Sequence, residues 1–133
     1  MDLVVSLNSD TPIYAQIVDQ IRAQILKGDL ASGAALPPIR SVARMLEVSV
    51  ITVKRAWEEL DREGLIYGVV GKGSFVAARP VDSLADQRRE VARQRLSHEL
   101  GFYRELGLTW VEFTDLARQQ WQSDQSDPSA PLS

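Results

Sequence analysis

Cysteine is absent from the chain, and histidine occurs only once, at His98. Without thiols the protein cannot form disulfide bonds, a cysteine nucleophile or a zinc ribbon, and one histidine alone cannot build a histidine-rich metal site. No apolar run approaches the ~20 residues of a membrane helix, and the N-terminus lacks the basic segment that begins a secretion signal. We therefore expect a cytoplasmic protein that uses no cofactor or metal and does not bind membranes.

Patterns that would indicate catalysis are also missing. No acid pair, nucleophile–base pair or phosphate-binding loop stands in a suitable context. The segment GVVGKGS, residues 68–74, superficially resembles a phosphate-binding loop, but it does not satisfy G-x-x-x-x-G-K-[ST] and is typical of a hairpin instead. The sequence therefore disfavours an enzyme.

Charge is unevenly distributed along the 133 residues. The net charge is −3, yet residues 1–80 contain nine basic and nine acidic side chains, whereas residues 81–133 contain six and nine. Between residues 36 and 57 there are four basic side chains and a single acid, Glu47. The local field there can be positive although the whole chain is acidic, which favours selective, salt-sensitive binding of a polyanion.

The stretch from Leu36 to Val76 is the most informative part of the sequence. It contains two helical patterns, residues 38–46 and 49–62, joined by a link of two to three residues that is short enough to hold them at a large angle. Ser49 is a good N-cap for the second helix, and Pro38 suits the first turn of the first. A glycine-rich hairpin follows. This order predicts an α+β fold with a winged helix-turn-helix, which is a DNA-reading device.

Each helix of the pair has an expected inward face and an outward face. The inward residues are Val42, Met45 and Leu46 in the first helix and Val53, Ala56, Trp57 and Leu60 in the second. At the start of the second helix Val50 and Ile51 remain exposed, where apolar groups can meet a thymine methyl in the major groove. Acidic residues come only from Glu58 onward, so we expect the helix to insert by its N-terminal end.

The hairpin is expected to consist of LIYGVV and SFVAA, joined by Gly71, Lys72 and Gly73. A lysine between glycines at a hairpin tip can approach a sugar-phosphate backbone closely. Residues 34–36 can add a short third strand to this sheet.

The run from Pro12 to Ala77 resembles the N-terminal domain of the GntR superfamily of bacterial transcription regulators. The resemblance rests on PIYAQIVDQIRAQILKGDL, on LPPIRSVARMLEVS and on VKRAWEELDREGLIYGVVGKGSFV. It implies base or phosphate contacts by Arg40, Thr52 and Lys54, and a wing whose Gly71 and Lys72 lie near the minor groove. Many members have Arg where Val50 stands, and the apolar helix start is closer to the small YtrA-type branch.

Each basic residue also has a simpler interpretation as a solvated surface charge. Arg44 could bond to Glu47, and Arg55 could pair with Glu59 one turn later. Their joint placement favours DNA contact instead. The complete expected DNA-binding set is Arg40, Arg44, Ser49, Val50, Ile51, Thr52, Lys54, Arg55, Gly71, Lys72 and Gly73.

Helical patterns flank this region on both sides. Thr11 and Pro12 are expected to open a first helix that ends at Gly28 and places an isoleucine at every fourth position. After residue 80 we expect a long helix to about Leu106 and a last helix opened by the T-x-x-E capping box of Thr109. The predicted organisation is a DNA-binding domain over residues 1–80, a helical dimerisation region over 81–122 and a disordered tail over 123–133.

The last two helices are amphipathic, and two such helices cannot cover their own apolar faces well. We therefore expect a second copy of the chain to cover these faces. The dimerisation residues are expected to be Leu96, Leu100, Tyr103, Phe113 and Leu116. The predicted function is therefore that of a homodimeric repressor on a palindromic operator; the resemblance implies operators of GT…AC form. The alternatives are a switch that binds a small-molecule effector between these helices, helices that fold back on the first domain, and a winged helix that binds only protein.

Overall fold

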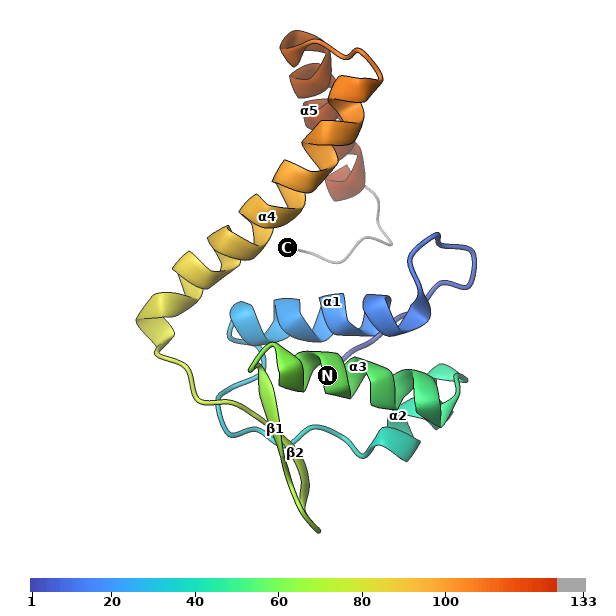
Figure 1. Cartoon of the computed structure of the whole chain (residues 1–133), viewed down its shortest axis with the longest axis vertical. Coiled ribbons are helices and arrows are strands. Elements are labelled where there is room, and N and C mark those ends of the chain that lie inside the picture. The colour runs from blue at the N-terminus through green and yellow to red at the C-terminus, as the bar shows by residue number, and fades with distance from the viewer. Residues whose placement is uncertain (127–133) are drawn as a thin grey trace. The chain divides into compact units, whose positions relative to one another are not determined.

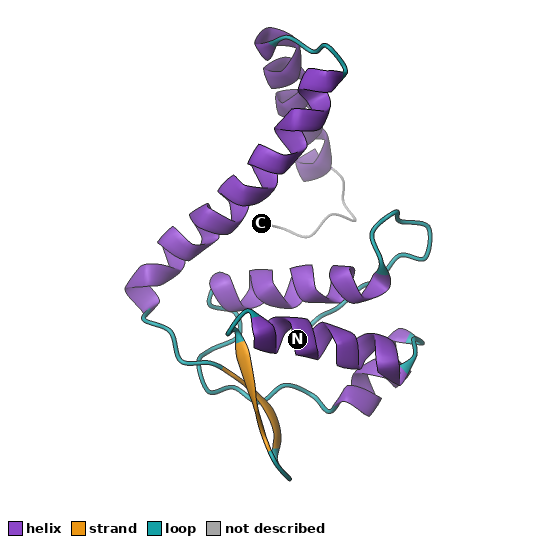
Figure 2. Cartoon of the chain, viewed as in Figure 1, coloured by secondary structure: helices purple, strands orange, loops and turns teal. Residues whose placement is uncertain are grey.

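The computed structural model describes residues 1–126, and the contacts of the chain divide it between Glu90 and Val91. The described part contains five α-helices and a short β-hairpin, which Figure 2 distinguishes by colour. In chain order the elements are α1 (Ile13–Leu26), α2 (Ile39–Leu46), α3 (Val50–Arg62), β1 (Ile66–Val69), β2 (Gly73–Val76), a 3-10 turn (Val81–Ser83), α4 (Leu84–Glu105) and α5 (Trp110–Ser126). The expected fold class, a winged helix-turn-helix followed by two helices, is confirmed.

The core of the first unit lies where α1 packs along α3 (Figure 1). Ile17 and Ile21, one turn apart on α1, are fully buried, and so are Val53 and Leu60 on α3. Full burial of one aliphatic side chain contributes about 1.5–3 kcal/mol, so this contact contributes strongly to the stability of the unit. The expected isoleucine stripe and the expected buried face of α3 are both confirmed.

The N-terminal segment is hydrogen-bonded to α1 by glutamines that recur every fourth residue. The Gln20 side chain accepts a hydrogen bond from the Val4 N–H at 2.9 Å and donates one to the Val4 carbonyl at 2.6 Å. Gln16 exchanges the same pair of bonds with Ser6. The glutamine side-chain amides thereby satisfy backbone N–H and C=O groups that would otherwise pair with another strand or with water. Residue 12, rather than the expected Thr11, occupies the N-cap position of α1, and no side chain caps it.

The turn between α2 and α3 depends on two residues. Glu47 adopts a left-handed conformation with φ of 57°, which ends α2, and the Ser49 hydroxyl accepts a hydrogen bond from the Thr52 N–H at 3.1 Å, which starts α3. The expected cap at Ser49 is confirmed. The expected inward position of Met45 is wrong, because α2 buries Val42 and Ala43 and leaves Met45 exposed.

The hairpin pairs β1 with β2 in antiparallel register, with Tyr67 opposite Phe75 and their rings stacked at 5.8 Å. The expected third strand at 34–36 is reduced to one β-bridge between Ala35 and Phe75. Two backbone hydrogen bonds of 2.9 Å flank this bridge and join the segment before α2 to β2.

The first turns of α4 belong to the first unit. The Arg88 guanidinium donates a hydrogen bond to the Leu26 carbonyl at the end of α1, at 2.8 Å, and Leu84 packs against the core cluster. The contacts therefore divide the chain ten residues after the boundary expected at residue 80. The expected boundary between a DNA-binding domain and a dimerisation region remains a prediction.

The capping box expected at the start of α5 is present. The Thr109 N–H donates to the Glu112 carboxylate at 3.0 Å, and the Glu112 N–H donates to the Thr109 hydroxyl at 3.2 Å. The backbone hydrogen bond from Thr109 lowers the pKa of Glu112, so the cap stabilises the helix at neutral pH and is lost as acid protonates the carboxylate. The helix continues to residue 126, four residues into the tail expected to be disordered, and residues 127–133 lie outside the described part.

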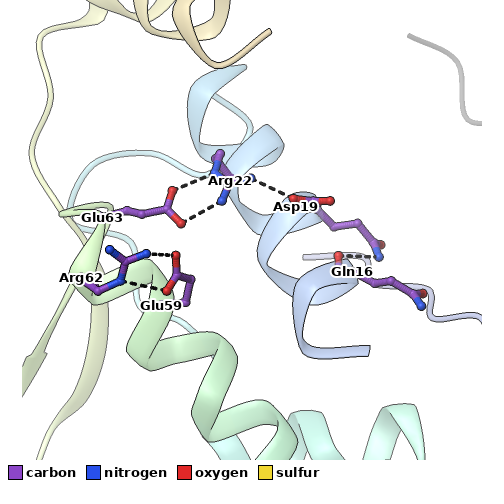
Figure 3. A network of polar contacts seen from close by, with 7 residues as sticks. Gln16, Asp19, Arg22, Glu59, Arg62 and Glu63 are labelled. Carbon is purple, nitrogen blue, oxygen red and sulfur yellow. Dashed lines mark hydrogen bonds and ion pairs between the residues drawn. The ribbon is translucent and has the colours of Figure 1, made fainter. Parts of the chain in front are cut away.

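An ion-pair network joins α1 to the end of α3 (Figure 3). The Arg22 guanidinium donates two hydrogen bonds to the Glu63 carboxylate, at 2.9 and 2.8 Å, and a third to Asp19 at 2.9 Å. The Arg22 side chain is 17% exposed, and the hydrogen bond to Glu63 is the main reason why the pKa of Arg22 is raised.

Removing Glu63 should therefore leave a half-buried guanidinium without its bidentate partner. We expect Glu63→Ala to lower the free energy of unfolding by about 1–3 kcal/mol, less than for a fully buried pair because water still reaches this one. Glu59→Ala, which breaks the more exposed pair with Arg62, should change it by less than about 1 kcal/mol. Urea denaturation of both variants measures the difference, and equal losses would contradict it.

Candidate nucleic-acid interface

The exposed side of α3 begins with apolar side chains. Ile51 is 78% exposed and Val50 is also exposed, while Val53 beside them is completely buried. The buried side of the helix fixes this orientation, so Ile51 cannot turn inward without exposing the core. Lys54 and Arg55 follow on the exposed side. An apolar helix start followed by cations suits the edge of a thymine and the adjacent phosphates.

The hydroxyls of Ser49 and Thr52 form a unit at the N-terminus of α3. They lie 2.7 Å apart, and Ser49 also accepts the Thr52 N–H. Part of their hydrogen-bonding capacity is therefore used for capping, and Thr52 is half-buried. Ser49 thus has a structural role that is independent of any DNA contact.

The basic residues of α2 lie one turn apart on its exposed side. Arg40 and Arg44 are both exposed, and within residues 1–126 neither forms an ion pair. The contact considered between Arg44 and Glu47 is not formed there. The short turn after α2 brings both arginines close in the chain to the start of α3.

Arg55 has a partner that sequence reasoning missed. Glu59, one turn later, was considered as an alternative ion partner of Arg55, but it is bound by Arg62, which lowers the pKa of the Glu59 carboxyl. The guanidinium carbon of Arg55 lies 3.8 Å from the centre of the Tyr14 ring on α1. Because 41 residues separate the two, helical spacing gave no signal for this contact.

The wing presents Lys72 at the tip of the β1–β2 hairpin. Its N–H donates a hydrogen bond to the Val69 carbonyl at 2.9 Å, which closes the turn. Gly71 and Gly73 have φ of 77° and 99°, and these values are strained for any residue with a side chain. The tip also carries Val70, a fully exposed apolar residue that the sequence analysis did not select.

The candidate residues on α2, at the start of α3 and on the wing come from segments that are joined to one another. The turn after α2 joins Arg40 and Arg44 to the start of α3, and the bridge at Ala35 joins the entry of α2 to the base of the wing. A helix of this kind fits the major groove, while a hairpin tip can follow the adjacent backbone.

Metal-ligand clusters and membrane-spanning helices are both absent from the described part of the chain. It contains no group of three or more His, Cys, Asp or Glu side chains that could hold a metal ion. None of its helices combines the length and the apolar character needed to cross a membrane. His98 is exposed on α4.

Comparison with known proteins gives a consistent result. The model of the family described as bacterial regulatory proteins, gntR family, matches residues 13–76. The transcriptional repressor YtrA of Bacillus subtilis is 33% identical over 88 residues, which are 66% of this chain and 68% of the repressor.

Two solved structures extend the similarity. The crystal structure of a transcriptional antiterminator from Listeria monocytogenes is 31% identical, with a TM-score of 0.71 over 92% of each chain. The AraR DNA-binding domain, solved in complex with operator ORX1, is 28% identical, with a TM-score of 0.52 over 58% of this chain and 96% of that domain.

If Lys54 reaches a base edge, Lys54→Ala should weaken binding to the preferred DNA sequence by about 1–3 kcal/mol and relax the base preference at one position. Arg40→Ala should act similarly, because both side chains are exposed and the fold does not need them. Titration of labelled duplexes by fluorescence anisotropy measures the effect. Unchanged affinity in both variants would contradict the interface.

Lys72→Ala should behave differently, because a wing lysine is expected to contact phosphate. Binding should weaken alike for all sequences, and the slope of log K against log salt should fall by about 1. Affinities for the preferred and an unrelated duplex between 50 and 200 mM salt would test this. A loss confined to the preferred duplex would show that the wing reads bases.

Proposed function

This chain belongs to the GntR family of bacterial transcription regulators, and we propose that it represses transcription as a homodimer bound to a palindromic operator. The display of Ile51, Lys54 and Arg55 on the exposed side of α3 is the observation that carries the DNA-reading part of the proposal. A repressor of this kind acts by occluding a promoter. The family's role in transcription regulation is not enzymatic.

The second unit supports the dimer. Neither α4 nor α5 has a buried residue among positions 84–125, although both carry large apolar side chains. Within this unit the two helices form an apolar groove of about 740 Å³, whose lining includes Leu96, Tyr103, Phe113, Leu116 and Trp121. Two helices cannot form a stable core alone, so a second copy is the occupant that we propose for this groove. Leu100, also expected in the interface, is half-buried and does not line the groove.

A ligand-sensing switch is the second candidate. The volume of the groove falls within the range of small-molecule pockets, and Tyr103, Phe113 and Trp121 offer aromatic surface. In this case a bound metabolite would accompany the purified protein, and mass spectrometry of the denatured protein would detect it.

Selection of bound sequences from a random DNA pool tests the main proposal. A symmetric consensus with two half-sites about one helical turn apart is the expected result, because a two-fold dimer mirrors its operator. Recovery of no consensus would overturn sequence-specific recognition, and a single half-site would overturn the dimeric mode.

Leu96→Asp and Leu116→Asp should each give a monomer whose first unit remains folded. Both residues line the groove and are 52% and 50% exposed in one chain, so a carboxylate there is tolerated in the monomer and must be desolvated in the dimer. Val111→Asp is the matched control, because Val111 is a 66% exposed apolar residue of α5 outside the groove lining. Sedimentation velocity should show monomers for the first two variants and a dimer for the control. Three dimers would place the interface elsewhere.

A further inference from the structure

We propose that Tyr14 is a positioning residue for DNA binding: its ring holds the Arg55 guanidinium so that the edge of that group donates to a backbone phosphate. This inference rests on the proposed DNA-binding function and adds to it a residue of α1, which lies outside the helix-turn-helix.

The contact has the geometry of a cation–π interaction. The guanidinium carbon lies over the ring at 3.8 Å from its centre, well inside the ~6 Å limit for such pairs. Tyr14 is half-buried in the first turn of α1 and packs against the hydrophobic core, so the ring has little freedom to move. Arg55 is exposed and follows Ile51 by one turn of α3.

The arrangement leaves the hydrogen-bond donors of Arg55 available. A guanidinium stacked on a ring uses its face, whereas its five N–H groups point outward in its plane. The acid best placed to take those donors, Glu59, is held by two hydrogen bonds from Arg62. Within residues 1–126 Arg55 forms no ion pair.

A stacked arginine also fits phosphate recognition energetically. A free arginine side chain loses rotamer freedom when it binds, and a ring that already restricts it removes part of that cost before DNA arrives. The position supports the same conclusion, because Arg55 lies one turn beyond Ile51 on the exposed side of α3, next to Lys54. A phosphate contact there would set the depth of the helix in the groove.

The test compares Tyr14→Leu, Tyr14→Phe and Arg55→Gln in the full chain, on the selected operator and on an unrelated duplex, between 50 and 200 mM salt. We expect Arg55→Gln to lower the salt slope by about 0.9 on both duplexes, as for one lost phosphate contact. Tyr14→Leu should weaken binding about two- to fivefold on both, whereas Tyr14→Phe, which keeps a ring, should bind like the wild type. Arg118→Gln, which removes an exposed arginine of α5 that pairs with Asp115, should leave the slope unchanged.

A double-mutant cycle separates positioning from a general structural effect. Tyr14→Leu should have no further effect in the Arg55→Gln background. The proposal is overturned if Tyr14→Leu binds normally, if Tyr14→Phe loses as much as Tyr14→Leu, or if the loss persists without Arg55. Should Tyr14→Leu unfold, an unchanged salt slope in Arg55→Gln overturns the proposal by itself. Failure of the wild type to prefer its operator would instead contradict the proposed function, because the phosphate contact is measured on the unrelated duplex as well.

Discussion

The packing of α1 against α3 is the contact on which the other features of the first unit depend. Helical periodicity allows α3 to bury one side only, and that side is occupied by Val53 and Leu60 against the isoleucines of α1. Ile51 and Arg55 are exposed as a consequence. The same helix pair brings Tyr14 under Arg55 and Arg22 against Glu63. The core thus determines which side chains α3 presents to a partner.

Most elements of the fold followed from local signals. The cap at Ser49 and the capping box at Thr109 were predictable because each depends on residues three positions apart. The partner of Arg55 and the ion pair of Arg22 with Glu63 were not, because both join segments 41 residues apart. Met45 was misplaced because α2 has only eight residues, and its pattern fits two faces until the direction of packing against α3 is known. The candidate site residues could be selected from the sequence, whereas the side chains that contact them could be identified only from the structure.

The distribution of charge separates two tasks along the chain. The basic residues of the proposed interface lie on α2, α3 and the wing, whereas the excess of acid lies after residue 80. Within α3 the acids come after Arg55, and Glu59 and Glu63 are engaged by Arg62 and Arg22. These pairs neutralise carboxylates that would otherwise repel phosphate close to the exposed side. If α3 binds DNA as proposed, these ion pairs serve the electrostatics of the proposed interface as well as the stability of the fold.

The second unit imposes a further constraint, because its helices bury no side chain over residues 84–125 and their apolar groove is open within one chain. Most of the stability of a helix in a protein comes from tertiary packing of its amphipathic face. If a second copy supplies that packing, formation of the unit depends on protein concentration, and its stability cannot be separated from dimerisation. Operator binding would then draw on the same equilibrium, since two tethered half-site contacts reinforce each other only while the dimer persists. A ligand that bound the groove more tightly in the monomer than in the dimer, or the reverse, would shift the occupancy of the operator according to that difference in affinity. Dimerisation and ligand sensing, the two proposed functions of the groove, are therefore thermodynamically linked.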